Sequence, residues 1–255
     1  HFVLVEAAKT QTLRDKPFVF EENKEKFNKF LSKIIHVKLE KEECPSGDFR
    51  QVSDDWGMEN FQRNGAIKGV ESLDLESNDI ILISDLDEIP NLSDVESNVE
   101  TIEKEKVTSF TQNTFSYFLN MQCFDIDDTD ETRKISRHSL GVARSVLYMY
   151  SPQELWSLRN TASGHQTPRG WHFSFMGGPE KVREKSLSCI EPFDKSDVPS
   201  KEEMEKIFNE RVFEEGFWNI NHPHDNSVKV RKVTDESILP DYVVNNRDKY
   251  TKLFC

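Results

Sequence analysis

Residues 79–90 read DIILISDLDEIP and carry the clearest structural signal in the chain. The β-branched run before Asp85 is typical of a strand buried on both faces. Such a strand brings Asp85 and Asp87 to its carboxyl end, where open α/β sheets bind their ligands, and Pro90 then ends the strand. Two carboxylates one residue apart can share a divalent cation if the backbone turns there, and Mg²⁺ and Mn²⁺ favour such oxygen ligands. The stretch therefore predicts a metal site at Asp85 and Asp87.

The residues before this stretch predict alternating strands and helices. Residues 2–6 and 34–39 read as strands, and residues 56–70 as a helix. Residues 21–33 place Phe27, Phe30 and Leu31 at spacings of three and four, which predicts an amphipathic helix with one buried stripe. This alternation predicts an α/β fold with a mostly parallel central sheet flanked by helices.

The pattern changes after Pro90. Residues 107–120 and 140–150 look like strands, and Ser200 with Glu203 forms a capping-box signature before a helix. We see no internal repeat and no low-complexity linker. We therefore expect a single domain over 1–255, with a nucleotide-binding half at 1–105 and an acceptor-side half at 106–255. The abrupt start, HFVLVE, leads us to expect a further strand upstream.

Composition restricts the possible functions. The net charge of −13 argues against a nucleic-acid surface, which needs clustered Lys and Arg. The 4 cysteines are widely spaced without a CxxC pair, so zinc fingers are disfavoured and free thiols in a reducing compartment are expected. We expect no signal peptide, and no apolar run in residues 1–255 reaches the roughly 18 to 20 residues that span a bilayer.

An acidic pair alone is weak evidence, because most such pairs are simply solvated. A haloacid-dehalogenase-like phosphatase also places DxD after a strand, although there Thr or Val normally follows, whereas here Glu88 does. His222 and His224 in NHPHD lack a second cluster, and the acidic run Asp125 to Glu131 reads as a solvated loop.

Several motifs, in order, resemble glycosyltransferase family 17, whose members include β-1,4-mannosyl-glycoprotein 4-β-N-acetylglucosaminyltransferases. The motifs are SDLDEIP at 84–90, WGMENFQRNG at 56–65 and GWHFSF at 170–175. FVLVE at the start, FEENKEKFNKF at 20–30 and LPDYVVNNRDKY at 239–250 extend the resemblance along nearly the whole chain.

The resemblance implies a GT-A type fold and inverting transfer from UDP-GlcNAc with a divalent metal, Mn²⁺ or Mg²⁺, to a glycan such as an N-glycan. By position, Asp87 matches the more direct metal ligand, and Asp85 contacts the metal or the ribose. Two features depart from the family. Residues 1–255 do not contain the N-terminal membrane anchor of the animal enzymes, and the segment after GWHFSF reads SCIEPF where a His is usual.

The resemblance gives further residues two alternative interpretations each. His172 is either a third metal ligand or a hydrogen-bonded core histidine. Trp171 either stacks on a sugar or is a buried structural residue. Arg63 either reaches the diphosphate or forms a salt bridge on the helix surface.

Two carboxylates complete the predicted site. Glu6 ends the first strand and either binds ribose or uracil or is a solvated surface residue. Glu191 is the candidate base, because its apolar setting beside Pro192 would raise its pKa.

The expected partners are a nucleotide-sugar donor and a glycan acceptor, without nucleic acid and without a membrane span. We expect a cytoplasmic microbial or viral relative, with the Golgi lumen as the alternative for a trimmed anchored enzyme. A non-catalytic nucleotide-sugar- or glycan-binding domain on a transferase scaffold is the competing function, and a phosphohydrolase is the third. The sequence does not identify the acceptor or the oligomeric state.

Overall fold

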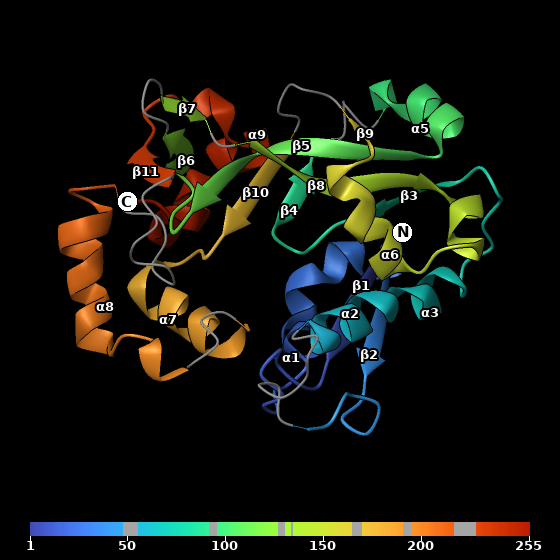
Figure 1. Cartoon of the computed structure of the whole chain (residues 1–255), viewed down its shortest axis with the longest axis horizontal. Helices are drawn as coiled ribbons and strands as arrows, with labels where there is room; N and C mark the ends of the chain where they lie inside the picture. Colours follow the sequence, from blue (N-terminus) through green and yellow to red (C-terminus); the bar gives the residue numbers. More distant parts are fainter. Residues whose placement is uncertain are drawn as a thin grey trace.

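The computed structural model describes residues 1–47, 56–91, 96–126, 131–133, 135–164, 170–190, 195–216 and 228–255. Strands in these ranges form a two-stranded sheet and a nine-stranded sheet. Figure 1 shows the large sheet across the upper part of the molecule, with the small sheet and its helices below the end that carries β3. The helices α7 and α8 lie below the other end (Figure 1).

The small sheet is parallel. It pairs β1 (Phe2–Ala7) with β2 (Ile34–Leu39), with Phe2 opposite Ile34 and Ala7 opposite Leu39. The chain between them forms α1 (Val19–Asn23) and a 3₁₀ helix over Lys24–Lys33. The helices α2 (Gly57–Asn64) and α3 (Ala66–Val70) pack against the pair. The predicted alternation of strand and helix is confirmed here.

The buried stripe predicted for residues 21–33 is wrong. Phe27 and Phe30 are 41 % and 53 % exposed, and the buried ring of this connection is Phe20. The physical reason is the helix type. A 3₁₀ helix has three residues per turn, so Phe27 and Phe30 align in one row, and that row faces away from the core.

The large sheet is built from nine strands. Their bounds are β3 Ile80–Ile83, β4 Glu88–Pro90, β5 Val107–Ser116, β6 Met121–Ile126, β7 Glu131–Arg133, β8 Ile135–Ala143, β9 Ser163–Gly164, β10 Gly170–Ser174 and β11 Val228–Lys232. The main path runs β11-β6-β5-β10-β4, with β8 joining β5 to β3.

The predicted mostly parallel central sheet, and with it the GT-A type architecture, is contradicted by the pairing in this sheet. β3 pairs antiparallel with β8, and β8 pairs antiparallel with β5. Only β5 with β10 and β5 with β9 are parallel among its described pairs. The predicted burial of β3 on both faces is wrong, because its four residues are only half-buried and β8 is its one partner among the described strands. Its apolar run also contains no information about strand direction. The direction of β3 in the sheet is set by β8, which runs antiparallel to both β5 and β3.

The predicted strand at 140–150 is only partly correct, since β8 ends at Ala143 and residues Arg144–Tyr148 form a 3₁₀ helix. The backbone N–H groups of Arg144 and Ser145 donate to the carbonyls of Asp79 and Ser77. These bonds turn the chain around the start of β3 and prevent the strand from continuing.

The remaining described helices lie mainly in the second half of the chain. They are α5 Val99–Glu105, α6 Pro152–Ser157, α7 Gly178–Ser188, α8 Lys201–Ile207, a π-helical turn Phe208–Val212, α9 Asp241–Asn245 and 3₁₀ segments Leu158–Asn160, Lys195–Asp197, Glu236–Ile238 and Arg247–Leu253. The predicted capping box is confirmed, because the Ser200 side chain accepts from the Glu203 N–H and Glu203 accepts from the Ser200 N–H. None of the helices in the described ranges combines the length and apolar character needed to cross a bilayer.

Candidate active site around the Asp85–Asp87 turn

A tight turn between β3 and β4 carries Asp85 and Asp87. The N–H of Glu88 donates to the carbonyl of Asp85 at 3.1 Å, and the N–H of Asp85 donates to Glu88 Oε2 at 3.0 Å. Leu86 at the tip is 88 % exposed, so the turn opens to solvent. The two reciprocal bonds fix the backbone between the aspartates.

The carboxylate of Asp85 is occupied by Arg63 from α2. Arg63 Nη2 lies 2.8 Å from Asp85 Oδ1 and 3.1 Å from Oδ2, and 2.8 Å from Glu59 Oε1. Nη1 donates to Gln153 of α6, and the guanidinium lies over the Trp156 ring, 3.8 Å from its centroid. The Arg63 side chain is only 8 % exposed. The structure thus directs Arg63 toward Asp85, and its predicted contact with a diphosphate stays a prediction.

The charge on Arg63 is stable in this setting. Burial opposes it, but the nearby carboxylates of Asp85 and Glu59 outweigh burial and raise the pKa of the guanidinium above its ordinary value. Asp85 is therefore neutralised by the protein itself. This makes it a poorer ligand for an added cation than Asp87.

The carboxylate of Asp87 lies between two side chains that come from beyond residue 170. Lys185 Nζ of α7 is 3.2 Å from Asp87 Oδ2, and His172 Nε2 of β10 is 3.9 Å from Asp87 Oδ1. The backbone carbonyl of Asp87 accepts from the Phe173 N–H at 2.8 Å. The antiparallel pairing of β4 with β10, which sets Glu88 opposite His172, brings these groups together.

Two histidine rings lie behind the turn. His138 Nδ1 of β8 is 3.1 Å from Glu88 Oε1, and the rings of His138 and His172 are 4.1 Å apart between centroids. Burial, followed by the charge of His138, lowers the pKa of His172 to about 4, against the opposing effect of Asp87. His172 is therefore a neutral imidazole at pH 7, which is the form that binds a metal.

Two side chains of the types that bind divalent cations lie side by side at this turn. Among the residues that the structure describes, no three His, Cys, Asp or Glu side chains are grouped so as to hold a metal ion. However, Asp87 and the neutral His172 face each other, and the ammonium of Lys185 already places a positive charge on Asp87. Mg²⁺ commonly uses one or two protein carboxylates and fills its other positions with water and substrate phosphates. The pair Asp87 and His172 fits a cation of this kind, whereas Asp85 is bound to Arg63.

The other predicted residues lie in different surroundings. Trp171 packs against a core cluster with Phe115 and Phe173, and its Nε1 donates to the Ile238 carbonyl at 2.6 Å, so the buried structural interpretation agrees with its position. Glu6 accepts from the Phe20 N–H and lies 2.9 Å from His36 Nε2, so it holds the first connection to the small sheet.

Glu191, His222 and His224 lie outside the described residues. The backbone next to Glu191 is tied to the site, because the Ile190 N–H donates to Gln11 Oε1 at 3.1 Å. Gln11 Nε2 in turn donates to Glu59, the carboxylate that pairs with Arg63.

The sequence alone missed four residues of this site. They are Trp156 and Arg159, whose guanidinium stacks 3.3 Å from the Trp156 ring centroid, and Lys185 and His138. Burial lowers the pKa of the Arg159 guanidinium, and this effect is larger than the opposing effect of the negative charges on Glu88 and Asp85. No local motif marks any of these side chains, because their role comes from contacts between distant parts of the chain.

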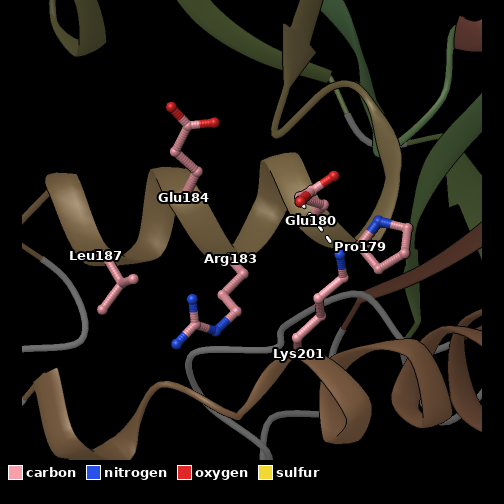
Figure 2. A pocket seen from close by; sticks show the side chains of 6 residues that line it. All are labelled: Pro179, Glu180, Arg183, Glu184, Leu187 and Lys201. Atoms are coloured by element: carbon pink, nitrogen blue, oxygen red, sulfur yellow. Dashed lines mark hydrogen bonds and ion pairs between the residues drawn. The ribbon is translucent and has the colours of Figure 1, made fainter.

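Two pockets in the described surface lie away from the turn. Figure 2 shows one of about 260 Å³ beside α7 and the start of α8, lined by Pro179, Glu180, Arg183, Glu184, Leu187 and Lys201. Lys201 reaches Glu180 across it, and the Arg183 Nε donates to the Pro199 carbonyl. A second, of about 590 Å³, lies between Phe213, Val230 and Cys255. Neither includes Asp85 or Asp87, and we rank the turn above both because it gathers ionisable side chains from α2, β4, β8, β10 and α7.

Comparison with known proteins gives one positive result. The sequence profile of glycosyltransferase family 17 matches residues 1–118, which include β1, α2 and the Asp85–Asp87 turn. Neither a curated protein sequence nor a solved structure gives a significant match.

Proposed function

We infer from its assignment to glycosyltransferase family 17, which the match over residues 1–118 supports, that this chain transfers a sugar from a nucleotide donor. The family is one of glycosyltransferases, so the general class of reaction follows from the assignment. We propose further that the donor is a UDP-sugar, UDP-GlcNAc by resemblance, that transfer inverts the anomeric carbon, and that it requires Mn²⁺ or Mg²⁺.

The observation that carries this proposal is the position of Asp87. It follows β3 on a turn fixed by Glu88, faces the neutral imidazole of His172, and is exposed enough to meet a substrate. Asp87 and His172 would hold the cation, which stabilises the departing diphosphate as a Lewis acid. Asp85, oriented by Arg63, is then available to accept hydrogen bonds from the donor's ribose.

The acceptor hydroxyl must also lose its proton. Glu191 stays our candidate base. The bonds from Ile190 through Gln11 and Glu59 to Arg63 support this role, because they connect the backbone next to Glu191 with the residues around Asp85. The glycan acceptor itself is identified by none of these contacts.

The test measures release of UDP from UDP-GlcNAc in the presence of Mn²⁺ by the unchanged chain, Asp87→Asn and Asp74→Asn. Asp74 is exposed and lies in the polar segment before β3, so it is a matched control for the loss of one carboxylate. We expect Asp87→Asn to lose more kcat than the roughly 10–100-fold that mutation of an outer-shell partner of a metal costs, and Asp74→Asn to keep full activity. Equal activity of the two variants would exclude the metal role of Asp87.

The same protein samples distinguish the proposed enzyme from the competing function, a nucleotide-sugar-binding domain without catalysis. It predicts binding of UDP-GlcNAc by calorimetry without release of UDP at any Mn²⁺ concentration. A phosphohydrolase instead predicts turnover of a simple phosphomonoester that needs no sugar nucleotide.

A further inference from the structure

Lys185 is the cation that contacts the more accessible of the two aspartates. It lies in the last turn of α7, and its Nζ is 3.2 Å from Asp87 Oδ2. The ammonium also lies 4.6 Å from the centroid of the Phe175 ring. Its side chain is 41 % exposed, against 8 % for Arg63 on Asp85. The two aspartates of the turn are therefore held in different ways, one by a buried guanidinium and one by a movable ammonium.

The contacts of the two basic residues differ in number as well as burial. Arg63 donates to Glu59, Asp85 and Gln153 and stacks on Trp156, so moving it would break four interactions. Among the described residues, Lys185 has one hydrogen-bond acceptor, Asp87, and one aromatic neighbour. Its flexible four-carbon stem can move away from Asp87 while its base stays on α7.

A divalent cation and Lys185 cannot both occupy the same oxygen of Asp87. Like charges a few ångströms apart repel strongly where water is partly excluded, and this carboxylate lies next to the half-buried ring of His172, which packs against His138. A cation held by Asp87 would therefore compete with the ammonium of Lys185, whose side chain is exposed enough to move. An ammonium is a strong hydrogen-bond donor to phosphate oxygens, so Lys185 would be available to the phosphates of a donor at this turn.

We propose that Lys185 is a further catalytic residue, which neutralises Asp87 in the free enzyme and binds the donor diphosphate once a divalent cation has taken Asp87. This inference rests on the proposed function and deepens it. In the transfer, the bond between the anomeric carbon and the diphosphate oxygen breaks, and its electron pair stays on that oxygen. Lys185 donates a hydrogen bond to the diphosphate and keeps its proton. The acceptor oxygen forms the new bond and gives its proton to the base.

The experiment compares the unchanged chain with Lys185→Met and Lys181→Met. Methionine keeps the apolar stem over Phe175 and removes only the charge. Lys181 is the matched control, because it lies one turn earlier on the same helix and pairs with Glu184 instead of Asp87. Calorimetry measures the affinity for Mn²⁺ without nucleotide, and then the affinity for UDP at saturating Mn²⁺.

The proposal predicts effects of opposite sign. Lys185→Met should bind Mn²⁺ about tenfold more tightly, because a competing charge has been removed, and UDP about tenfold more weakly, because a phosphate donor is lost. Lys181→Met should match the unchanged chain in both. Lys185→Arg, which keeps a cation at this position, should restore most of the UDP affinity.

The possible failures are distinguishable. If Lys185→Met leaves both affinities unchanged, or lowers both, Lys185 is a structural residue and this inference is overturned while the metal role of Asp87 stands. If the unchanged chain binds neither Mn²⁺ nor UDP, the proposed function fails, and this inference fails with it.

Discussion

The carboxylate of Glu88 accepts a 3.0 Å hydrogen bond from the backbone N–H of Asp85, so the third acidic residue of DLDE closes the turn that carries the first two. The other oxygen of Glu88 lies 3.1 Å from His138 Nδ1, and its side chain is 2 % exposed. Glu88 is thus a positioning residue, joining the turn to the histidine pair behind it. Glu88 therefore fixes the turn through hydrogen bonds within the protein, although in the sequence it directly follows the two candidate metal ligands.

Replacing Glu88 should therefore reduce stability as well as activity. Glu88→Ala leaves the Asp85 N–H and His138 Nδ1 without their acceptor, and we expect a loss of about 2–3 kcal/mol in the free energy of unfolding. Glu88→Gln keeps one acceptor oxygen and should lose about half as much. Urea denaturation followed by circular dichroism gives both values. Glu103→Ala, an exposed position on α5, is the control and should change stability little; equal losses at Glu88 and Glu103 would contradict the role of Glu88.

The contact between Arg63 and Asp85 should appear as an energetic coupling. A double-mutant cycle with Arg63→Met and Asp85→Asn should give a coupling energy of about 1 kcal/mol or more, because the guanidinium is buried and contacts both carboxylate oxygens. Arg63→Lys should recover little of this coupling energy. A lysine cannot donate to Glu59 and Gln153 while it also stacks on Trp156 and contacts Asp85. Additive effects of the two substitutions would show that the contact contributes no net stability.

The lowered pKa of His172 predicts how stability depends on pH. Its pKa falls from 6.5 to about 4 on folding, so the unfolded chain takes up this proton first as pH decreases. The stability from keeping His172 neutral is fully present above pH 6.5 and is lost as pH falls toward 4, by on the order of 3 kcal/mol. His172→Gln should flatten the curve of unfolding free energy in this interval relative to the unchanged chain. His1→Gln, at the exposed first residue, should leave the slope as it is.

Gly170 begins the GWHFSF motif because its backbone adopts φ +144° against β4. A Cβ at this position would lie 2.3 Å from the Ile89 carbonyl oxygen. Gly170→Ala should cost about 3 kcal/mol and loosen the pairing that sets His172 opposite Glu88. Gly57→Ala at the start of α2, where a Cβ meets open space, should be neutral or stabilise by about 0.5–1 kcal/mol. Thermal unfolding of the two variants provides the comparison, and similar melting temperatures would contradict the strain at Gly170.

Local patterns in the sequence predicted many elements correctly. The apolar runs gave β1, β2 and β3, the polar and apolar spacing gave α2 and α3, and Ser200 with Glu203 gave the start of α8. These features depend on residues that are close in the sequence, so they can be predicted from local sequence patterns. The 3₁₀ helix at Lys24–Lys33 was missed because its spacing of aromatic residues is also compatible with an α-helix.

By itself, the sequence determined that Asp85 and Asp87 follow an apolar strand on a turn, because the apolar run, the acidic pair and Pro90 are contiguous. Only the tertiary structure decided the direction of that strand, since antiparallel pairing with β8 depends on residues more than fifty positions away. It also decided that Asp85 meets Arg63, 22 residues earlier, whereas Asp87 meets Lys185, 98 residues later. The physical reason is the range of the interactions. Backbone propensity and burial act locally, whereas ion pairs and strand pairing form only after folding has brought distant segments together.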